Sequence, residues 1–155
     1  MTRKYDMTRR AKRQEETRRR IVEAAVELHQ TVGMARTTIS AIAEKAGVER
    51  LRMALSEVYA YHRRTEPMMA NFIRDAPVHP LTREMAEPYF QLFERIRYVL
   101  ATGWGVEDER LALLLATLGH ALDFQTWRSL VRQQSLNDEQ AIEVMVGMVR
   151  CLMLG

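Results

Sequence analysis

Residues 18–48 read RRRIVEAAVELHQTVGMARTTISAIAEKAGV, and this stretch decides the fold. Its apolar residues recur at i, i+3, i+4, i+7 and i+11, on one face of an α-helix: Ile21, Ala24, Ala25, Leu28 and Val32. We therefore expect a helix over 16–32 that stops at Gly33. Thr38 can cap a second helix that ends at Gly47. Two short helices joined by a turn are typical of a helix-turn-helix.

The rest of the chain also predicts helices. Only seven Gly and four Pro occur among the 155 residues, and no pair of alternating segments suggests a β-hairpin. Apolar spacing and capping residues predict helices over 49–64, 65–76, 82–101, 107–133 and 138–153. Thr65 should cap the second of these, Pro88 should kink or split the third, and Asn137 with Gln140 should form a capping box before the last. The predicted fold class is all-α.

The composition excludes several classes of protein. Hydrophobic residues make up 47% and charged residues 28%, as in soluble globular proteins. The single cysteine, Cys151, excludes an internal disulfide and a cysteine-based zinc site. The four histidines do not fall at metal-ligand spacing, and no catalytic motif is present. We therefore expect no metal, no cofactor and no enzymatic activity. The N-terminus has no secretory signal, so we expect a cytoplasmic protein.

Charge is distributed unevenly along the chain. Residues 1–64 hold 15 Lys and Arg against 8 Asp and Glu, a balance of +7, whereas residues 65–155 hold 8 against 12, a balance of −4. Residues 1–15 are predicted to form a basic, disordered arm. Such an arm suits a polyanion, because each cation laid on a phosphate releases condensed counterions. A solvated tail without a partner is the alternative.

Three sequence features together resemble the TetR family of bacterial transcriptional regulators. They are RRRIVEAA at 18–25, Gly33, and TTISAIAEKAGV at 37–48. The resemblance implies that the first three helices bind double-stranded operator DNA and that the remaining helices form a ligand-binding and dimerisation bundle. It also implies a homodimer in the bacterial cytoplasm, most often a repressor that leaves DNA when a small-molecule effector binds.

The chain departs from the family pattern directly after Val48. Relatives continue with a recognition helix opened by Ser or Thr and closed by an aromatic motif, whereas here Glu49 occupies the opening position and no such motif follows. Relative to typical members, we expect that about 40 residues are missing between Val48 and Leu51, judged from usual domain lengths. Either the protein has an internal deletion, or the given sequence omits a segment. The helix-turn-helix unit is therefore assigned to 16–52 in truncated form, and the regulatory domain to 53–155. The alternative function is a dimerising or ligand-binding remnant that cannot bind DNA.

Three sets of candidate site residues follow from these assignments. The DNA-binding candidates are Arg18, Arg19, Thr37, Thr38, Ser40, Lys45, Glu49 and Arg50. The ligand-binding candidates are aromatic residues, methionines and a few polar groups, which could equally form an ordinary core: Tyr59, His62, Met69, Phe72, Tyr89, Phe93, His120, Asp123, Phe124 and Trp127. The candidates for the dimer interface are Leu115, Leu118, Leu122, Ile142, Val146 and Val149.

Overall fold

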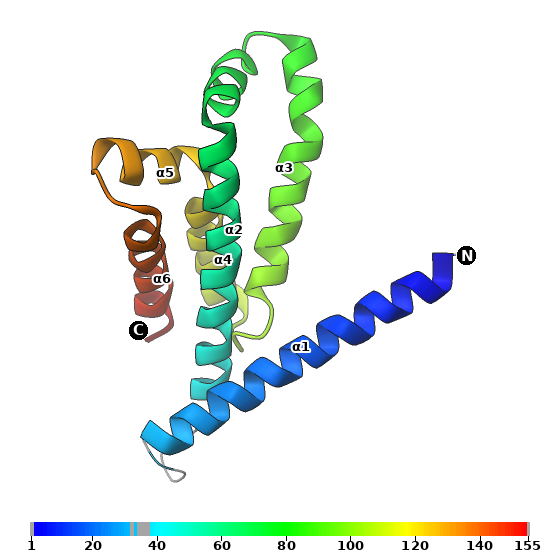
Figure 1. The fold of residues 1–155 in the computed structure, drawn as a ribbon, viewed down its shortest axis with the longest axis vertical. Helices are drawn as coiled ribbons and strands as arrows, with labels where there is room; N and C mark the ends of the chain where they lie inside the picture. The colour runs from blue at the N-terminus through cyan, green and yellow to red at the C-terminus, as the bar shows by residue number, and fades with distance from the viewer. Residues whose placement is uncertain (1, 32, 34–37, 155) are drawn as a thin grey trace. The chain divides into compact units, whose positions relative to one another are not determined.

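The part of the chain that the structure describes is built from helices alone. The structure is a computed structural model, and it describes residues 2–31, 33 and 38–154. In chain order the helices are α1 (Thr2–Thr31), α2 (Ile39–Asp75), α3 (Pro80–Ala101), α4 (Asp108–Leu122), α5 (Phe124–Arg128), the π-helix η2 (Ser129–Gln133) and α6 (Asp138–Leu154) (Figure 1). The predicted all-α class is confirmed. None of the described helices is long and apolar enough to cross a membrane.

The chain divides into two compact units. The first comprises residues 1–47 together with 103–105, and the second comprises residues 48–102 and 106–155. The domain boundaries expected from the sequence, at residues 15 and 52, stay a prediction, because compactness alone does not test what each part does.

Helix α1 is longer than the sequence predicted. Residues 2–15, expected as a disordered arm, have helical backbone and form the first half of α1. The physical reason is composition, because residues 2–31 contain no Gly or Pro and are rich in Arg, Lys, Glu and Ala, which favour helices. Glu16 adds support through ion pairs with Arg19 and Arg20, each at 2.9 Å.

The C-terminal end of α1 agrees with the prediction. The helix ends at Thr31, and Gly33 has φ of +84°, a left-handed conformation that glycine adopts without strain. Within the same unit, Lys45 Nζ lies 2.7 Å from Glu27 Oε1, which links the first turns of α2 to α1.

Helix α2 is continuous over 37 residues, and this corrects two predictions. The helix does not end at Gly47, and no separate helix starts at Thr65, whose hydroxyl instead donates to the carbonyl of Tyr61. Pro67 lies inside the helix, although proline removes a backbone hydrogen bond there. Burial outweighs that loss, because α2 presents a long apolar face that includes Leu51, Leu55, Val58, Tyr59 and Met69.

The second unit is a bundle of α3, α4 and α6 with the main part of α2. α3 packs against α4, and α4 packs against α6 (Figure 1). Its largest fully buried side chains include Trp127, Tyr59, Phe124, Leu114 and Leu118. α3 is not split at Pro88, since one helix runs from Pro80 to Ala101.

The helix predicted over 107–133 is interrupted. α4 ends at Leu122, and Asp123 caps α5 by accepting a hydrogen bond from the backbone N–H of Thr126 at 2.9 Å. A π-helical turn, η2, follows α5. The predicted capping box before α6 is confirmed, since Asn137 Oδ1 accepts from the Gln140 N–H and Gln140 Oε1 accepts from the Asn137 N–H.

Candidate functional site

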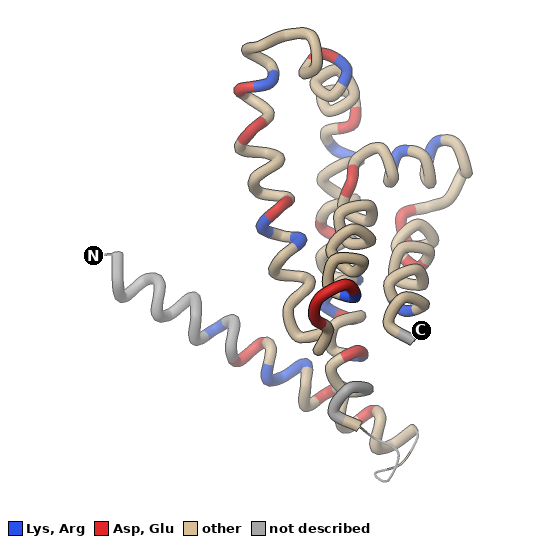
Figure 2. The backbone as a smooth tube through the Cα atoms, turned by 180° about the vertical axis from the view of Figure 1, so that it is seen from behind, with Lys and Arg blue, Asp and Glu red and all other residues tan. Residues whose placement is uncertain are grey.

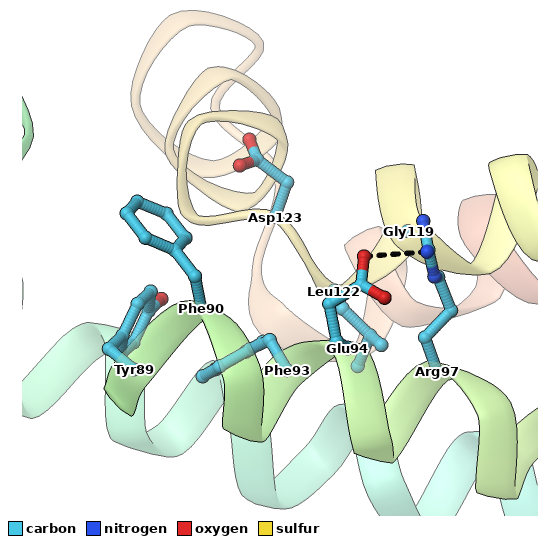
Figure 3. Close-up of a pocket in the computed structure, with 8 residues that line it drawn as sticks. All are labelled: Tyr89, Phe90, Phe93, Glu94, Arg97, Gly119, Leu122 and Asp123. Atoms are coloured by element: carbon cyan, nitrogen blue, oxygen red, sulfur yellow. Dashed lines mark hydrogen bonds and ion pairs between the residues drawn. The ribbon is translucent and has the colours of Figure 1, made fainter. Parts of the chain in front are cut away.

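A pocket lies between α3 and the C-terminal end of α4 (Figure 3). Its volume is about 200 Å³, and its lining residues are Tyr89, Phe90, Phe93, Glu94, Arg97, Gly119, Leu122 and Asp123. The first five come from α3, so one helix supplies most of the wall. The pocket holds apolar rings together with acidic and basic groups, which is the usual make-up of a small-molecule site.

The aromatic wall of the pocket continues into a buried cluster centred on His62. The His62 ring stacks on Phe93, with centroids 5.9 Å apart, and meets Phe124 edge-on at 5.4 Å. Trp127 lies 5.8 Å away on the same cluster. These rings come from α2, α3 and α5, so the cluster ties three helices of this unit together.

His62 is fully buried and only half satisfied by hydrogen bonds. Its Nε2 donates to the carbonyl of Leu122 at 3.1 Å, so in the neutral ring Nδ1 is the acceptor. Nδ1 has no hydrogen-bond partner among the described residues. Burial lowers the pKa of His62, because the charged ring would be poorly solvated there. The ring is therefore neutral near pH 7.

The polar groups at the mouth of the pocket are partly used within the fold. Arg97 Nη2 donates to Glu94 Oε1 at 2.6 Å, which forms an ion pair along α3 (Figure 3). Asp123 uses one carboxylate oxygen as the cap of α5. His120 shares a hydrogen bond with the hydroxyl of Thr126 at 3.1 Å. Burial raises the pKa of Tyr89 above its ordinary value, so its hydroxyl stays protonated.

The structure brings together most of the ten ligand-binding candidates. Tyr89, Phe93 and Asp123 line the pocket, whereas Phe72 touches Tyr89 at its edge, with centroids 6.5 Å apart. The members that belong to the buried core instead are Tyr59, His62, Met69, Phe124 and Trp127. His120 is exposed and does not line the pocket. Ligand binding by any of these residues stays a prediction.

Sequence reasoning missed five lining residues: Phe90, Glu94, Arg97, Gly119 and Leu122. A signal for three of them exists, because Phe90, Glu94 and Arg97 lie at i, i+4 and i+7 on one helix face beside Phe93. Gly119 carries no such signal. It lines the pocket because α3 passes close by, with an Arg97 side-chain atom 3.3 Å from where a Cβ would stand.

The residues expected at a dimer interface are placed mainly inside the chain, and a role for them in dimerisation stays a prediction. Leu118, Leu122, Ile142, Val146 and Val149 are all buried within the bundle, and Leu115 is half-buried. The reason is that α4 and α6 pack against each other, which buries the stripes that the sequence left free for a second copy. Among the described side chains of these helices, the large apolar residues that are exposed are Leu113, Val144 and Met148.

Several DNA-binding candidates make contacts within the chain. Lys45 pairs with Glu27, and Glu49 pairs with Arg52 at 2.8 Å. Arg50 donates to the carbonyls of Leu100 and Thr102, where it satisfies the C-terminal end of α3. Glu49 and Arg50 thus lie within an unbroken helix rather than at the start of a new one.

The remaining DNA-binding candidates lie near the start of the chain. Arg18 and Arg19 are exposed on α1, and the basic residues of its described part are blue in Figure 2. Thr38 is exposed, and its carbonyl accepts from the Ile42 N–H at 3.1 Å, as expected for the residue before a helix. Thr37 and the side chain of Ser40 lie outside the described residues. A role in DNA binding stays a prediction for every member of the set.

Comparison with known proteins matches part of the chain to a family model. Residues 21–50 match the model of the bacterial regulatory proteins of the tetR family, over 30 of the 155 residues. No curated protein and no solved structure matches the chain. The matched segment contains the apolar face of α1, Gly33 and the first turns of α2, which are the features that carried the resemblance in the sequence. This N-terminal segment is therefore similar to the bacterial regulatory proteins of the tetR family.

Proposed function

We propose that the chain is a transcriptional repressor whose DNA binding is controlled by a small-molecule effector. The match of residues 21–50 supports the regulatory role. The pocket between α3 and α4 supports the effector, because it offers a concave, ring-lined site in the second unit, whereas residues 21–47 of the matched segment lie in the first unit. In this proposal the chain is not an enzyme, and it acts in the bacterial cytoplasm, where the DNA is.

The DNA contact in this proposal is electrostatic and resides in the first unit. Arg18 and Arg19 are exposed on α1, and the first unit holds 11 Lys and Arg against 6 Asp and Glu, a balance of +5. Such a surface binds duplexes of any sequence, with an affinity that falls steeply as salt rises. The salt dependence is measured as the slope of log K for DNA binding against the logarithm of the salt concentration. Each phosphate contact contributes about 0.9 to the magnitude of this slope, so replacing both arginines by glutamine should lower the magnitude by about two. Replacing the exposed Arg83 and Arg95 of α3 in the same way removes equal charge and serves as the control.

A second candidate function is a remnant that binds a ligand and a second copy but no specific operator. The continuity of α2 favours it. In a helix-turn-helix the chain must turn before the recognition helix, yet α2 passes through Gly47, Val48 and Glu49 without a turn. Reading bases requires several side chains held at the base edges, and Arg50 is already engaged at the end of α3.

An exposed apolar stripe on α3 also favours the second candidate. Leu81, Met85, Leu92 and Val99 recur at spacings of four and seven residues, and all four are exposed. Alternating three- and four-residue steps are typical of a face that packs against another helix. The stripe is what a chain that lacks a covering segment would leave exposed.

One binding experiment separates the two candidates. The affinity of the 155-residue chain for duplexes from its own promoter is compared with its affinity for random duplexes, at fixed salt. Discrimination of 1,000-fold or more, the lower end of ordinary specificity ratios, supports the repressor. A ratio near one supports the remnant. Inserting a family-like recognition segment between Val48 and Arg50 should then restore discrimination.

We further propose that a second copy packs against the exposed side of α4 and α6. Val144 and Met148 are 43% and 45% exposed, and they lie four residues apart on α6. Gly147 lies on the same side, and a Cβ there would meet nothing within 4 Å, which allows a close helix approach. Replacing Met148 by glutamate should produce a monomer, whereas replacing the exposed Met53 of α2 by glutamate should not. A wild-type monomer of 18.0 kDa by light scattering would contradict the dimer.

A further inference from the structure

The pocket has a wall of three aromatic rings, all from α3. Tyr89 and Phe93 lie with centroids 4.5 Å apart, and Phe90 meets Tyr89 edge-on at 5.5 Å. In Figure 3, Phe90 extends from α3 toward the side of the pocket where Asp123 lies. Phe90 is also half-exposed, so its ring surface is available to a ligand. Such a wall favours a flat, apolar ligand that can stack on it or meet it edge-on.

The charges around the pocket are unbalanced. Arg97 is the only basic lining residue, and it is paired with Glu94 at 2.6 Å. Asp123 is the second acidic lining residue, and only its Oδ2 is used, by the Thr126 N–H. Within the described residues, no Lys or Arg forms an ion pair with Asp123. One negative charge therefore remains at the pocket.

The groups behind the wall do not offset this charge. His62 stacks on Phe93 and is neutral, since burial lowers its pKa. Tyr89 stays protonated for the same physical reason. The formal charge of the lining residues therefore stays at −1. It favours a cation and disfavours an anion, and aromatic ring faces add attraction for a cation placed over them.

The volume restricts the size of the ligand. At about 200 Å³, the pocket is smaller than the sites of about 300–1,000 Å³ that hold drug-sized molecules. A ligand of one or two fused rings matches that volume, whereas a larger polycyclic ligand does not.

We propose that this pocket binds a small planar aromatic cation, with its rings against Phe90 and Phe93 and its charge toward Asp123. The inference rests on the proposed function, in which the pocket is the effector site, and it adds the chemical class of the effector. The aromatic wall selects for planarity, the volume selects for one or two rings, and the unbalanced carboxylate selects for positive charge.

Three probes of nearly equal size test the class by titration calorimetry on the full chain at pH 7.5. They are N-methylquinolinium, a cation; quinoline, which has the same rings and is neutral at this pH; and naphthalene-2-carboxylate, an anion. We expect the cation to bind at least tenfold more tightly than quinoline and the anion to bind most weakly. Asp123→Asn keeps a side chain that can cap α5 but removes the charge. It should weaken cation binding about tenfold and leave quinoline binding within twofold.

Two further variants complete the test. Asp75→Asn removes a carboxylate that is paired with Arg74 outside the pocket, so it should leave the binding of all three probes unchanged. Phe90→Leu removes a ring from the wall and should weaken the binding of both N-methylquinolinium and quinoline. Thermal unfolding of each variant, followed by circular dichroism, establishes that it remains folded.

The outcomes separate this inference from the proposal on which it rests. A preference for the cation that disappears in Asp123→Asn supports the inference. Equal binding of all three probes, or an unchanged preference in Asp123→Asn, overturns the chemical class and leaves the pocket as an effector site. Binding of none of the probes at millimolar concentration overturns the class and also argues against this pocket as the effector site. The proposed DNA binding is tested independently by the promoter experiment.

Discussion

Truncating Leu118 to alanine tests whether α4 is held mainly by the chain's own core. Leu118 is 0% exposed, and the substitution removes three carbon groups. At about 0.8 kcal/mol for each buried group, the lost transfer free energy is about 2.4 kcal/mol. The cavity left behind adds to this, so we expect a loss of about 3–4 kcal/mol, within the usual range of about 2–5 kcal/mol for such changes. That is a large share of the roughly 5–15 kcal/mol that stabilises a typical domain.

Leu113→Ala is the matched control, because it removes the same atoms from the same helix. Leu113 is 47% exposed, so about half of its transfer free energy is at stake and little cavity forms. We expect a loss of about 1 kcal/mol. Urea unfolding followed by circular dichroism gives both losses of stability. The comparison holds where the slope of the free energy of unfolding against urea concentration is the same in the variants and the wild type.

Measuring at two protein concentrations, tenfold apart, distinguishes a core residue from an interface residue. A core residue loses the same free energy at both concentrations, whereas the loss at a subunit interface depends on concentration. The assignment of Leu118 to the core is refuted if its truncation costs less than 1 kcal/mol. It is equally refuted if the cost of Leu118→Ala changes with concentration while that of Leu113→Ala does not.

Three further predictions concern α3 and the buried polar groups. Changing both Met85 and Leu92 to glutamine should leave the free energy of unfolding within about 0.5 kcal/mol of the wild-type value, because both side chains are exposed. The change should also reduce aggregation, measured by light scattering. A loss of stability above about 2 kcal/mol would show that the two side chains are buried. Asp138 accepts from Arg63 and from the Trp127 indole, and Arg63 lowers its pKa, so Asp138→Asn should cost about 1–2 kcal/mol at pH 7. That cost should shrink as the pH falls below about 3.8, where the carboxyl of the unfolded chain becomes protonated, and a cost that is constant from pH 7 to pH 3 would contradict the assignment. Burial lowers the pKa of His62, so its contribution to the free energy of unfolding should be complete above pH 6.5 and fall as the pH drops below that value. His62→Phe should flatten this part of the plot of stability against pH. An equally steep plot for the variant would refute the role of His62.

Much of the local structure followed from the sequence, because local chemistry determines it. The stop at Gly33 requires a left-handed residue, and the capping box at Asn137 and Gln140 requires only contacts three residues apart. The all-α class followed from the scarcity of Gly and Pro and from the spacing of apolar residues. The same spacing placed Tyr89 and Phe93 on one face of α3, where both now line the pocket.

The continuity of α2 could not be read from the sequence. By local rules Gly47 suggests the end of a helix and Pro67 the first turn of a new one, yet one helix continues through both positions. The glycine is accommodated by a close contact in the first unit, since a Cβ at this position would lie 2.7 Å from the Trp104 ring. Residue 104 is far along the chain, so no local pattern predicts that contact. Long-range packing therefore overrode local propensity.

Sequence alone determined that α6 is apolar on more than one side, and tertiary structure decided which side is inside. α6 carries Val146 and Val149 on one stripe and Val144 and Met148 on another, and hydrophobicity alone does not rank the two. Packing against α4 buried the first stripe and left the second exposed. The choice depends on how the helices fit together, because side chains of similar hydrophobicity gain similar free energy on burial wherever they are placed.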